Sequence, residues 1–135
     1  MTSVEWTPAL FASIDAKDTQ RLLSFLSDDA RFRFGNLPAA VGREAIREAV
    51  NGFFASIAAC RHDVANVWAP NGHVICQGEV TYTRHDGGVL TLPFVNVFRM
   101  AGSLIRDYAI YVDASTLFSA SLADETTAAA RRGPK

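Results

Sequence analysis

Residues 89–100 read VLTLPFVNVFRM, and one set of alternate positions in this stretch is almost entirely apolar. Alternate residues of a β-strand share one face, so this period of two predicts a long strand with one buried side. The residues on that side are Leu90, Leu92, Phe94, Asn96, Phe98 and Met100. Asn96 is the one polar residue among five large apolar ones.

The same period extends in both directions from this strand. It predicts further strands over residues 62–68, 74–84 and 104–112, separated by short turns rich in Gly, Asn and Asp. Consecutive strands with short turns form an antiparallel meander. Pro93 has no N–H to donate, so it indicates a sheet edge or a bulge at its position.

The first third of the chain has helical spacing instead. Thr7 and Pro8 mark the start of one helix and Asp18 the start of a second, which ends near residue 27. A third amphipathic helix is predicted over residues 42–57, and a short strand over residues 30–34. Helices followed by strands predict an α+β domain with the helices packed on one face of the sheet.

Composition narrows the classes of function. Of the 135 residues, 49% are hydrophobic, and 13 Lys and Arg against 14 Asp and Glu give a net charge of −1. We therefore expect no nucleic-acid partner and no binding to an anionic membrane. No apolar run reaches the length of a membrane span, and no signal peptide is evident, so we expect a cytoplasmic protein.

The sequence contains no motif for metal, phosphate or nucleophilic catalysis. Three scattered histidines and two cysteines, Cys60 and Cys76, do not have the spacing of a metal site, and we expect two buried thiols. Glycine-rich phosphate loops and the Gly-x-Ser-x-Gly motif are missing from the sequence. We therefore expect neither a metal nor a cofactor.

Several polar residues have two readings. Asn96 is either a structural amide or an amide that faces a ligand in an apolar cavity. Tyr82 and Tyr108 lie on the more apolar sides of their strands, and His62 begins a strand beside an acidic residue. Asp107 is on the opposite face from Tyr108, and periodicity leaves open which of the two faces is inside.

Three short motifs carry a family resemblance. Residues 22–32 (LLSFLSDDARF), 42–46 (GREAI) and 105–113 (IRDYAIYVD) resemble, in order and spacing, the SnoaL-like branch of the nuclear-transport-factor-2-like superfamily. The resemblance covers residues 7–118. It implies a single cone-shaped domain over residues 1–118, in which three N-terminal helices close over a strongly curved antiparallel sheet and leave an apolar pocket. Residues 119–135 would form a flexible tail.

Members of this superfamily include isomerases, epoxide hydrolases, polyketide cyclases, dehydratases and binding proteins, so each site position needs its own check. The resemblance places Phe34 and Leu10 where ketosteroid isomerases have a base and a tyrosine, and Asn96 where they have a protonated acid. Val80 and Tyr82 stand in place of the epoxide hydrolase Arg-x-Asp pair, and Ile110 near its second aspartate. None of these chemistries has its acid or base at the aligned position.

The sequence therefore supports two main hypotheses. The first is a binding protein that holds a small hydrophobic, carbonyl- or hydroxyl-bearing molecule in an apolar cone. The alternative is an isomerase, dehydratase or cyclase-type enzyme, with a base at His62 or Asp107 and oxygen-binding groups at Asn96, Tyr82 or Tyr108. In both cases we expect the pocket to be lined by Phe34, Trp68, Val80, Phe94, Phe98 and Ile110.

A third and weaker hypothesis is a partner-binding module that uses the outer face of the sheet. The family commonly pairs through this convex face, so the resemblance also implies a homodimer.

Overall fold

The computed structural model describes residues 3–117, so the predicted tail over 119–135 lies outside the described residues. The helices are α1 (Thr7–Asp15), α2 (Thr19–Leu23) and α3 (Arg43–Ser56). The strands are β1 (Leu26–Phe34), β2 (Ala40–Val41), β3 (Ala59–Trp68), β4 (His73–Thr83), β5 (Val89–Ala101) and β6 (Leu104–Val112). The α+β class and the helix-then-strand order are as predicted.

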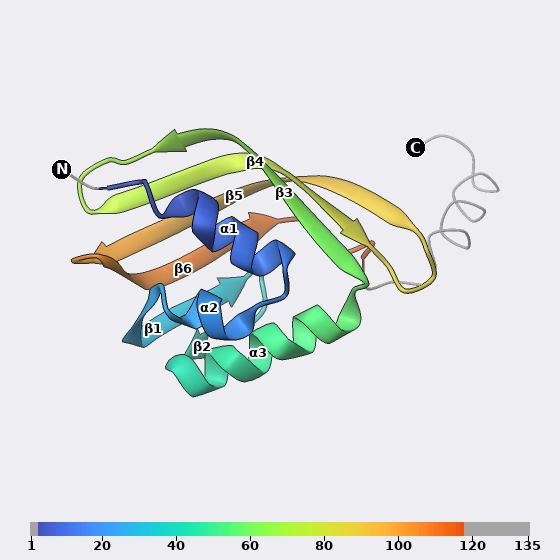
Figure 1. The fold of residues 1–135 in the computed structure, drawn as a ribbon, viewed down its shortest axis with the longest axis horizontal. Helices are drawn as coiled ribbons and strands as arrows, with labels where there is room; N and C mark the ends of the chain where they lie inside the picture. The colour runs from blue at the N-terminus through green and yellow to red at the C-terminus, as the bar shows by residue number, and fades with distance from the viewer. Residues whose placement is uncertain (1–2, 118–135) are drawn as a thin grey trace.

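All six strands belong to one sheet in the order β2-β1-β6-β5-β4-β3. The predicted meander from β3 to β6 is confirmed as antiparallel, and β1 pairs with β6 in parallel. The sheet is therefore mixed rather than wholly antiparallel. It is curled but not closed, and the three helices lie on one side of it (Figure 1).

The first strand begins earlier than the sequence predicted. Residues 26–29 were expected to end the second helix, but α2 stops at Leu23 and β1 starts at Leu26. Leu26 pairs with Ile105 of β6, and the carbonyl oxygen of Phe25 accepts a hydrogen bond from Ile105 N at 2.9 Å. Pairing with a distant strand thus overrides the local helical spacing of the sequence.

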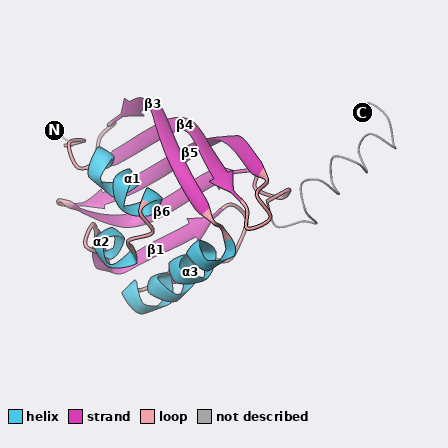
Figure 2. Cartoon of the chain, turned by 45° about the vertical axis from the view of Figure 1, so that its right-hand side comes forward, coloured by secondary structure: helices cyan, strands magenta, loops and turns pink. Residues whose placement is uncertain are grey.

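The helices pack their apolar faces onto the concave side of the sheet. Ile46, Val50 and Phe54 of α3 are buried at helical spacing, and Leu10 of α1 is fully buried. The turned view shows β3 curling over toward α1 (Figure 2). Within residues 3–117, no helix is both long and apolar enough to cross a membrane.

A bulge in β3 reverses which face its side chains occupy. His62 pairs with Val80 on the concave side, but the register with β4 shifts between Val64 and Asn66. Beyond the shift, Trp68 pairs with Ile75 and its side chain is 51% exposed. Trp68 was predicted to line the pocket, and this prediction is wrong because one extra residue moves it to the outer face.

Pro93 lies where the sequence indicated an interruption. It pairs with Glu79 of β4, whereas the pairing of β5 with β6 begins only at Phe94. At Pro93 the strand is therefore a local edge, and its missing N–H leaves no gap in a ladder of hydrogen bonds.

Gly78 is required where β3 bends over β4. A Cβ atom there would overlap the carbonyl oxygen of Asp63 and approach Val64 Cα to 2.9 Å. We predict that Gly78→Ala destabilises the fold by about 1–3 kcal/mol, as overpacking does in other interiors. Thermal and urea unfolding measure this change.

The matched control is Gly52→Ala in α3. A Cβ atom at Gly52 has no neighbour within 4 Å, and alanine favours a helix by about 1 kcal/mol over glycine. Gly52→Ala should therefore stabilise the protein. Equal stability of the two variants would contradict the proposed close approach of β3 and β4.

Candidate functional site

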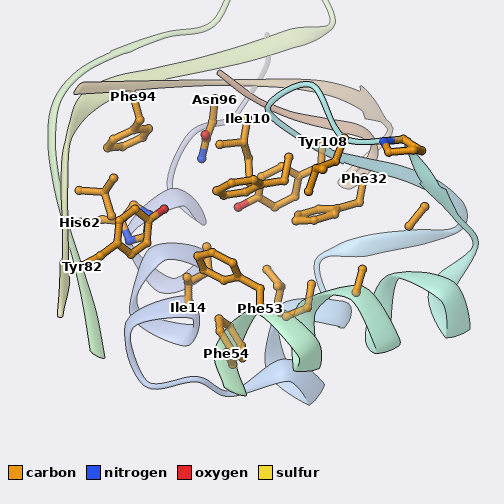
Figure 3. Close-up of a pocket in the computed structure, with 18 residues that line it drawn as sticks. Ile14, Phe32, Phe53, Phe54, His62, Tyr82, Phe94, Asn96, Tyr108 and Ile110 are labelled. Carbon is orange, nitrogen blue, oxygen red and sulfur yellow. The ribbon is translucent and has the colours of Figure 1, made fainter. Parts of the chain in front are cut away.

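An inner cavity lies between the concave face of the sheet and the helices. Its volume is about 120 Å³, and aromatic rings form much of its wall (Figure 3). The described residues that line it are Ile14, Leu22, Phe32, Phe34, Leu37, Pro38, Ala40, Ala49, Val50, Phe53, Phe54, His62, Val80, Tyr82, Phe94, Asn96, Tyr108 and Ile110.

His62 and Asp15 form a hydrogen-bonded pair at the wall of this cavity. His62 Nδ1 lies 2.6 Å from Asp15 Oδ1, and the backbone N–H of His62 donates to Asp15 Oδ2 at 3.0 Å. A carboxylate can only accept, so the imidazole carries its proton on Nδ1. This leaves Nε2, which has no partner among the described residues, as the basic nitrogen of a ring that lines the cavity.

Packing fixes the plane of the imidazole. The ring centroid of His62 is 5.1 Å from that of Phe11 in α1 and 5.2 Å from that of Phe94 in β5. The His62 side chain is only 8% exposed. The ring therefore keeps one orientation, with one nitrogen bound to Asp15 and the other available.

A buried thiol lies behind the carboxylate. Cys60 Sγ is 3.6 Å from the carbonyl oxygen of Ile14 and 3.8 Å from Asp15 Oδ1. Burial, and next the negative charge of Asp15, raise the pKa of Cys60 to about 12. Cys60 is thus a neutral thiol in contact with the carboxylate, and it is not an activated nucleophile.

Asp15, Cys60 and His62 are also a possible ligand set for a metal, because their ligand atoms all lie within 4.8 Å of one another. Two ligands of one tetrahedral zinc stand roughly 3.3 Å apart, given bonds of about 2.0 Å. The 2.6 Å between His62 Nδ1 and Asp15 Oδ1 fits a shared proton better. The raised pKa of the Cys60 thiol also disfavours the thiolate that a metal needs.

Asn96 projects from β5 into the cavity. It is 1% exposed, and its Oδ1 has no hydrogen-bond partner within the described part of the chain. Figure 3 shows the amide pointing into the space between His62 and Tyr108. The amide therefore faces the cavity, and its Oδ1 is not satisfied by the described part of the protein.

Two tyrosine hydroxyls share the cavity with Asn96. Tyr82 and Tyr108 are 3% and 2% exposed, and the described residues provide no hydrogen bond to either hydroxyl. Burial is the main cause that raises the pKa of both phenols above the ordinary value. Both therefore remain neutral donors at any physiological pH.

The other predicted pocket residues divide into two groups. Phe34, Val80, Phe94 and Ile110 line the cavity as predicted. Phe98 is fully buried but lies outside the cavity lining, because its ring packs against Tyr108 at 4.7 Å and against Trp6 and Phe11 in the core. The prediction that Phe98 lines the pocket is wrong for this reason, whereas the prediction for Trp68 is wrong because of the β3 bulge.

Asp107 lies on the outer face of the sheet. Its carboxylate is 3.9 Å from Arg31 and 3.8 Å from Arg99 on neighbouring strands. Tyr108, the next residue, points into the cavity. Asp107 therefore lies on the face of the sheet opposite the cavity. It cannot act as a base there.

Asp15 is the site residue that sequence reasoning missed. Its partner His62 is 47 positions away, so no local pattern connects them. One signal was present: Asp15 is the last residue of α1, where the helix dipole disfavours a negative charge. An acidic residue in that position, one residue after the buried Ile14, indicates a stabilising partner on another element of the fold.

Comparison with known proteins agrees with this fold. The sequence matches the SnoaL-like domain family over residues 8–108, and the chain belongs to this family. No curated protein matches the sequence.

Solved structures with the same fold are described as different classes of protein. A protein of ketosteroid isomerase-like fold from Catenulispora acidiphila, solved in complex with trimethylamine, is 17% identical, with a TM-score of 0.78 over 86% of this chain and 91% of that one. A putative SnoaL-like polyketide cyclase from Jannaschia is 18% identical, with a TM-score of 0.75 over 86% and 88%. An epoxide hydrolase-like protein of M. tuberculosis is 12% identical, with a TM-score of 0.69 over 83% of each chain. At these identities the likeness establishes the fold alone.

The two buried thiols give the stability a defined pH dependence. Burial raises the pKa of Cys60 from 9.0 to about 12 and that of Cys76 from 9.0 to about 11. The unfolded chain loses these protons near pH 9 while the folded chain keeps them. The contribution of the thiols to the free energy of unfolding should therefore be constant below pH 9 and fall above it, by up to about 1.4 kcal/mol per pH unit for each thiol.

Urea unfolding at half-unit steps from pH 8 to 10 measures this slope. The window ends at the ordinary pKa of tyrosine, so the phenols contribute little to it. The double variant Cys60→Ala, Cys76→Ala should have a flatter profile than the wild type. Identical slopes for the two proteins would show that the thiols are not responsible.

Proposed function

We propose that this SnoaL-like protein is an acid–base enzyme that needs no cofactor and removes a proton from a small, mostly apolar compound bearing a carbonyl or hydroxyl group. The observation that carries this proposal is the Asp15–His62 pair at the cavity wall. A pure binding protein has no need of an imidazole held in one tautomer by a carboxylate. The enzyme hypothesis is therefore favoured over the carrier hypothesis.

His62 and Asp15 have different roles in the proposed acid–base catalysis. His62 Nε2 accepts the proton, and Asp15 holds the ring and stabilises the imidazolium that forms. A charge in an apolar cavity is strongly affected by its neighbours. The negative charge 2.6 Å from Nδ1 thus lowers the cost of forming a cation beside the substrate.

The cavity also offers neutral hydrogen-bond donors to the oxygen of the substrate. When His62 takes a proton from a carbon next to a carbonyl, the electron pair of the broken C–H bond moves onto the carbonyl oxygen. Asn96 Nδ2 and the hydroxyls of Tyr82 and Tyr108 line the same cavity and are suited to donate to that oxyanion. The imidazolium then returns the proton to another carbon or to a leaving hydroxyl. The first outcome is an isomerisation and the second a dehydration.

A general probe of carbon deprotonation tests this proposal. 5-Nitrobenzisoxazole loses one C–H proton to a base as its N–O bond breaks, giving a coloured cyanophenolate. The wild-type protein should accelerate this reaction. His62→Ala should reduce the rate constant by about 10²–10⁴-fold, as expected for loss of a general base, and Asp15→Asn by at least about tenfold.

Two variants control for non-specific effects. His73 is the first residue of β4 and does not line the cavity, and Asp107 lies on the outer face. His73→Ala and Asp107→Asn should therefore react at the wild-type rate. A wild-type rate for folded His62→Ala, or an equal loss for His73→Ala, would refute the assignment of the base.

We also propose that the protein forms a homodimer through the outer face of the sheet. The strand registers align an apolar row across four strands on this face, made of Trp68, Ile75, Val97 and Ala109. The next row along the strands on this face contains Gln77, Val95 and Tyr111, and two charged rows lie outside these two rows. One row contains Arg31, Arg99 and Asp107, and the other contains Asp63 and Glu79. A second copy related by a two-fold axis would bring the arginine row of one chain over the acidic row of the other.

Light scattering of the purified chain tests the dimer. We expect twice the mass of one chain for the wild type and the monomer mass for Val97→Arg. Val41→Arg, at an exposed position of β2, is the control and should remain dimeric. A monomeric wild type at micromolar concentration would contradict the proposal.

A cytoplasmic location remains part of this proposal. Cys60 and Cys76 are both buried and unpaired, as is typical of proteins from a reducing compartment.

A further inference from the structure

The polar and apolar groups of the inner cavity are unevenly distributed between its interior and its mouth. Leu37, Pro38 and Ala49 line the cavity and are also exposed, so they border its opening between the β1–β2 connection and α3. The buried polar residues of the lining are His62, Tyr82, Asn96 and Tyr108, which come from β3, β4, β5 and β6. A ligand therefore meets hydrocarbon first and hydrogen-bonding groups afterwards.

The interior offers no permanently charged counter-ion to a charged ligand. Of the lining residues that the structure describes, none is Lys, Arg, Asp or Glu. A carboxylate or phosphate would lose its hydration without gaining a cation, which costs several kcal/mol per ion. It would also approach the carboxylate of Asp15, which lies directly behind the His62 ring. The cavity is thus unfavourable to anions. An ammonium group would also lose its hydration, because the nearest carboxylate, Asp15, is outside the lining and is already hydrogen-bonded to His62.

The enclosed space limits the part of a ligand that fits inside. An apolar cavity of about 150 Å³ is known to hold one benzene molecule. At about 120 Å³, the inner cavity accommodates one six-membered ring, and its walls include the rings of Phe32, Phe34, Phe53 and Phe94. Any larger ligand must leave its remaining atoms at the mouth, beside Leu37.

We infer that the ligand binds head first as an uncharged six-membered ring that carries one hydroxyl or carbonyl oxygen. The oxygen lies at Asn96, whose Nδ2 can donate to a carbonyl or a hydroxyl oxygen and whose Oδ1, without a partner among the described residues, can accept from a hydroxyl. An apolar tail lies at the mouth. This inference rests on the proposed function for the identity of the site. It adds the charge, the ring count and the orientation of the substrate.

Four probes of nearly equal shape test the head group at pH 7. They are 4-methylphenol (neutral, one oxygen), p-xylene (neutral, no oxygen), 4-methylbenzoate (anion) and 4-methylbenzylamine (cation). Calorimetric titration of the full chain should give a dissociation constant for 4-methylphenol at least about tenfold below those of both ions. Asn96→Leu should remove the advantage of 4-methylphenol over p-xylene while p-xylene still binds.

The orientation needs a longer ligand. A 4-hexylphenol places its chain at the mouth if the hydroxyl lies at Asn96. Leu37→Asp puts a charge beside that chain, so it should weaken 4-hexylphenol several-fold more than 4-methylphenol. Val41→Asp, equally exposed but not part of the lining, should leave the ratio of the two affinities at its wild-type value.

The outcomes separate this inference from the proposed function. If 4-methylbenzoate or 4-methylbenzylamine binds as tightly as 4-methylphenol, the inference on charge is overturned while the base assignment is unaffected. Equal effects of Leu37→Asp on the two phenols overturn the orientation. By contrast, if the wild-type protein does not accelerate proton removal from 5-nitrobenzisoxazole, or does so equally well without His62, the proposed function itself is overturned.

Discussion

The hydrogen bonds between Asp15 and His62 join the end of α1 to the middle of β3. One carboxylate oxygen accepts from the imidazole at 2.6 Å and the other from the backbone N–H of the same histidine at 3.0 Å. This double contact holds α1 over the concave face of the sheet and sets the tautomer of the ring. The unfavourable position of a carboxylate at a helix C-terminus is offset by these charge-assisted bonds.

The cavity beside this pair is costly to maintain. An unpartnered buried oxygen such as Asn96 Oδ1 costs about 1–3 kcal/mol. Unsatisfied buried polar groups of this kind are found more often at functional sites than elsewhere in a protein. The β3 bulge contributes as well, since it allows one strand to place His62 inside and Trp68 on the outer face.

Much of the fold could be predicted because its signals are local. The period of two over residues 62–112 correctly predicts the meander, and the alternation in β5 places Phe94 and Asn96 on the concave face. The parallel pairing of β1 with β6 could not be predicted in this way. It depends on contacts between Leu26 and Ile105, far apart in sequence, and these override helical spacing.

The site was predictable only in part, for the same physical reason. His62, Tyr82, Asn96 and Tyr108 share a cavity because neighbouring strands bring equivalent faces together. Trp68 was predicted on the wrong face because periodicity does not reveal a bulge. The face of Asp107 stayed open because alternation defines two faces without saying which is inside. Asp15 was missed because its role exists only in the tertiary contact with β3.

The most direct measurement of the central claim is the tautomer of His62. A nitrogen-15 and proton NMR spectrum of histidine-labelled protein, recorded at pH 8 and assigned with His62→Gln, observes both ring nitrogens. The account predicts a hydrogen-bonded Nδ1–H proton at low field, an unprotonated Nε2, and loss of the low-field signal in Asp15→Ala. A proton on Nε2 with a bare Nδ1, or a spectrum unchanged in Asp15→Ala, would contradict the role of Asp15 and His62 as an oriented base.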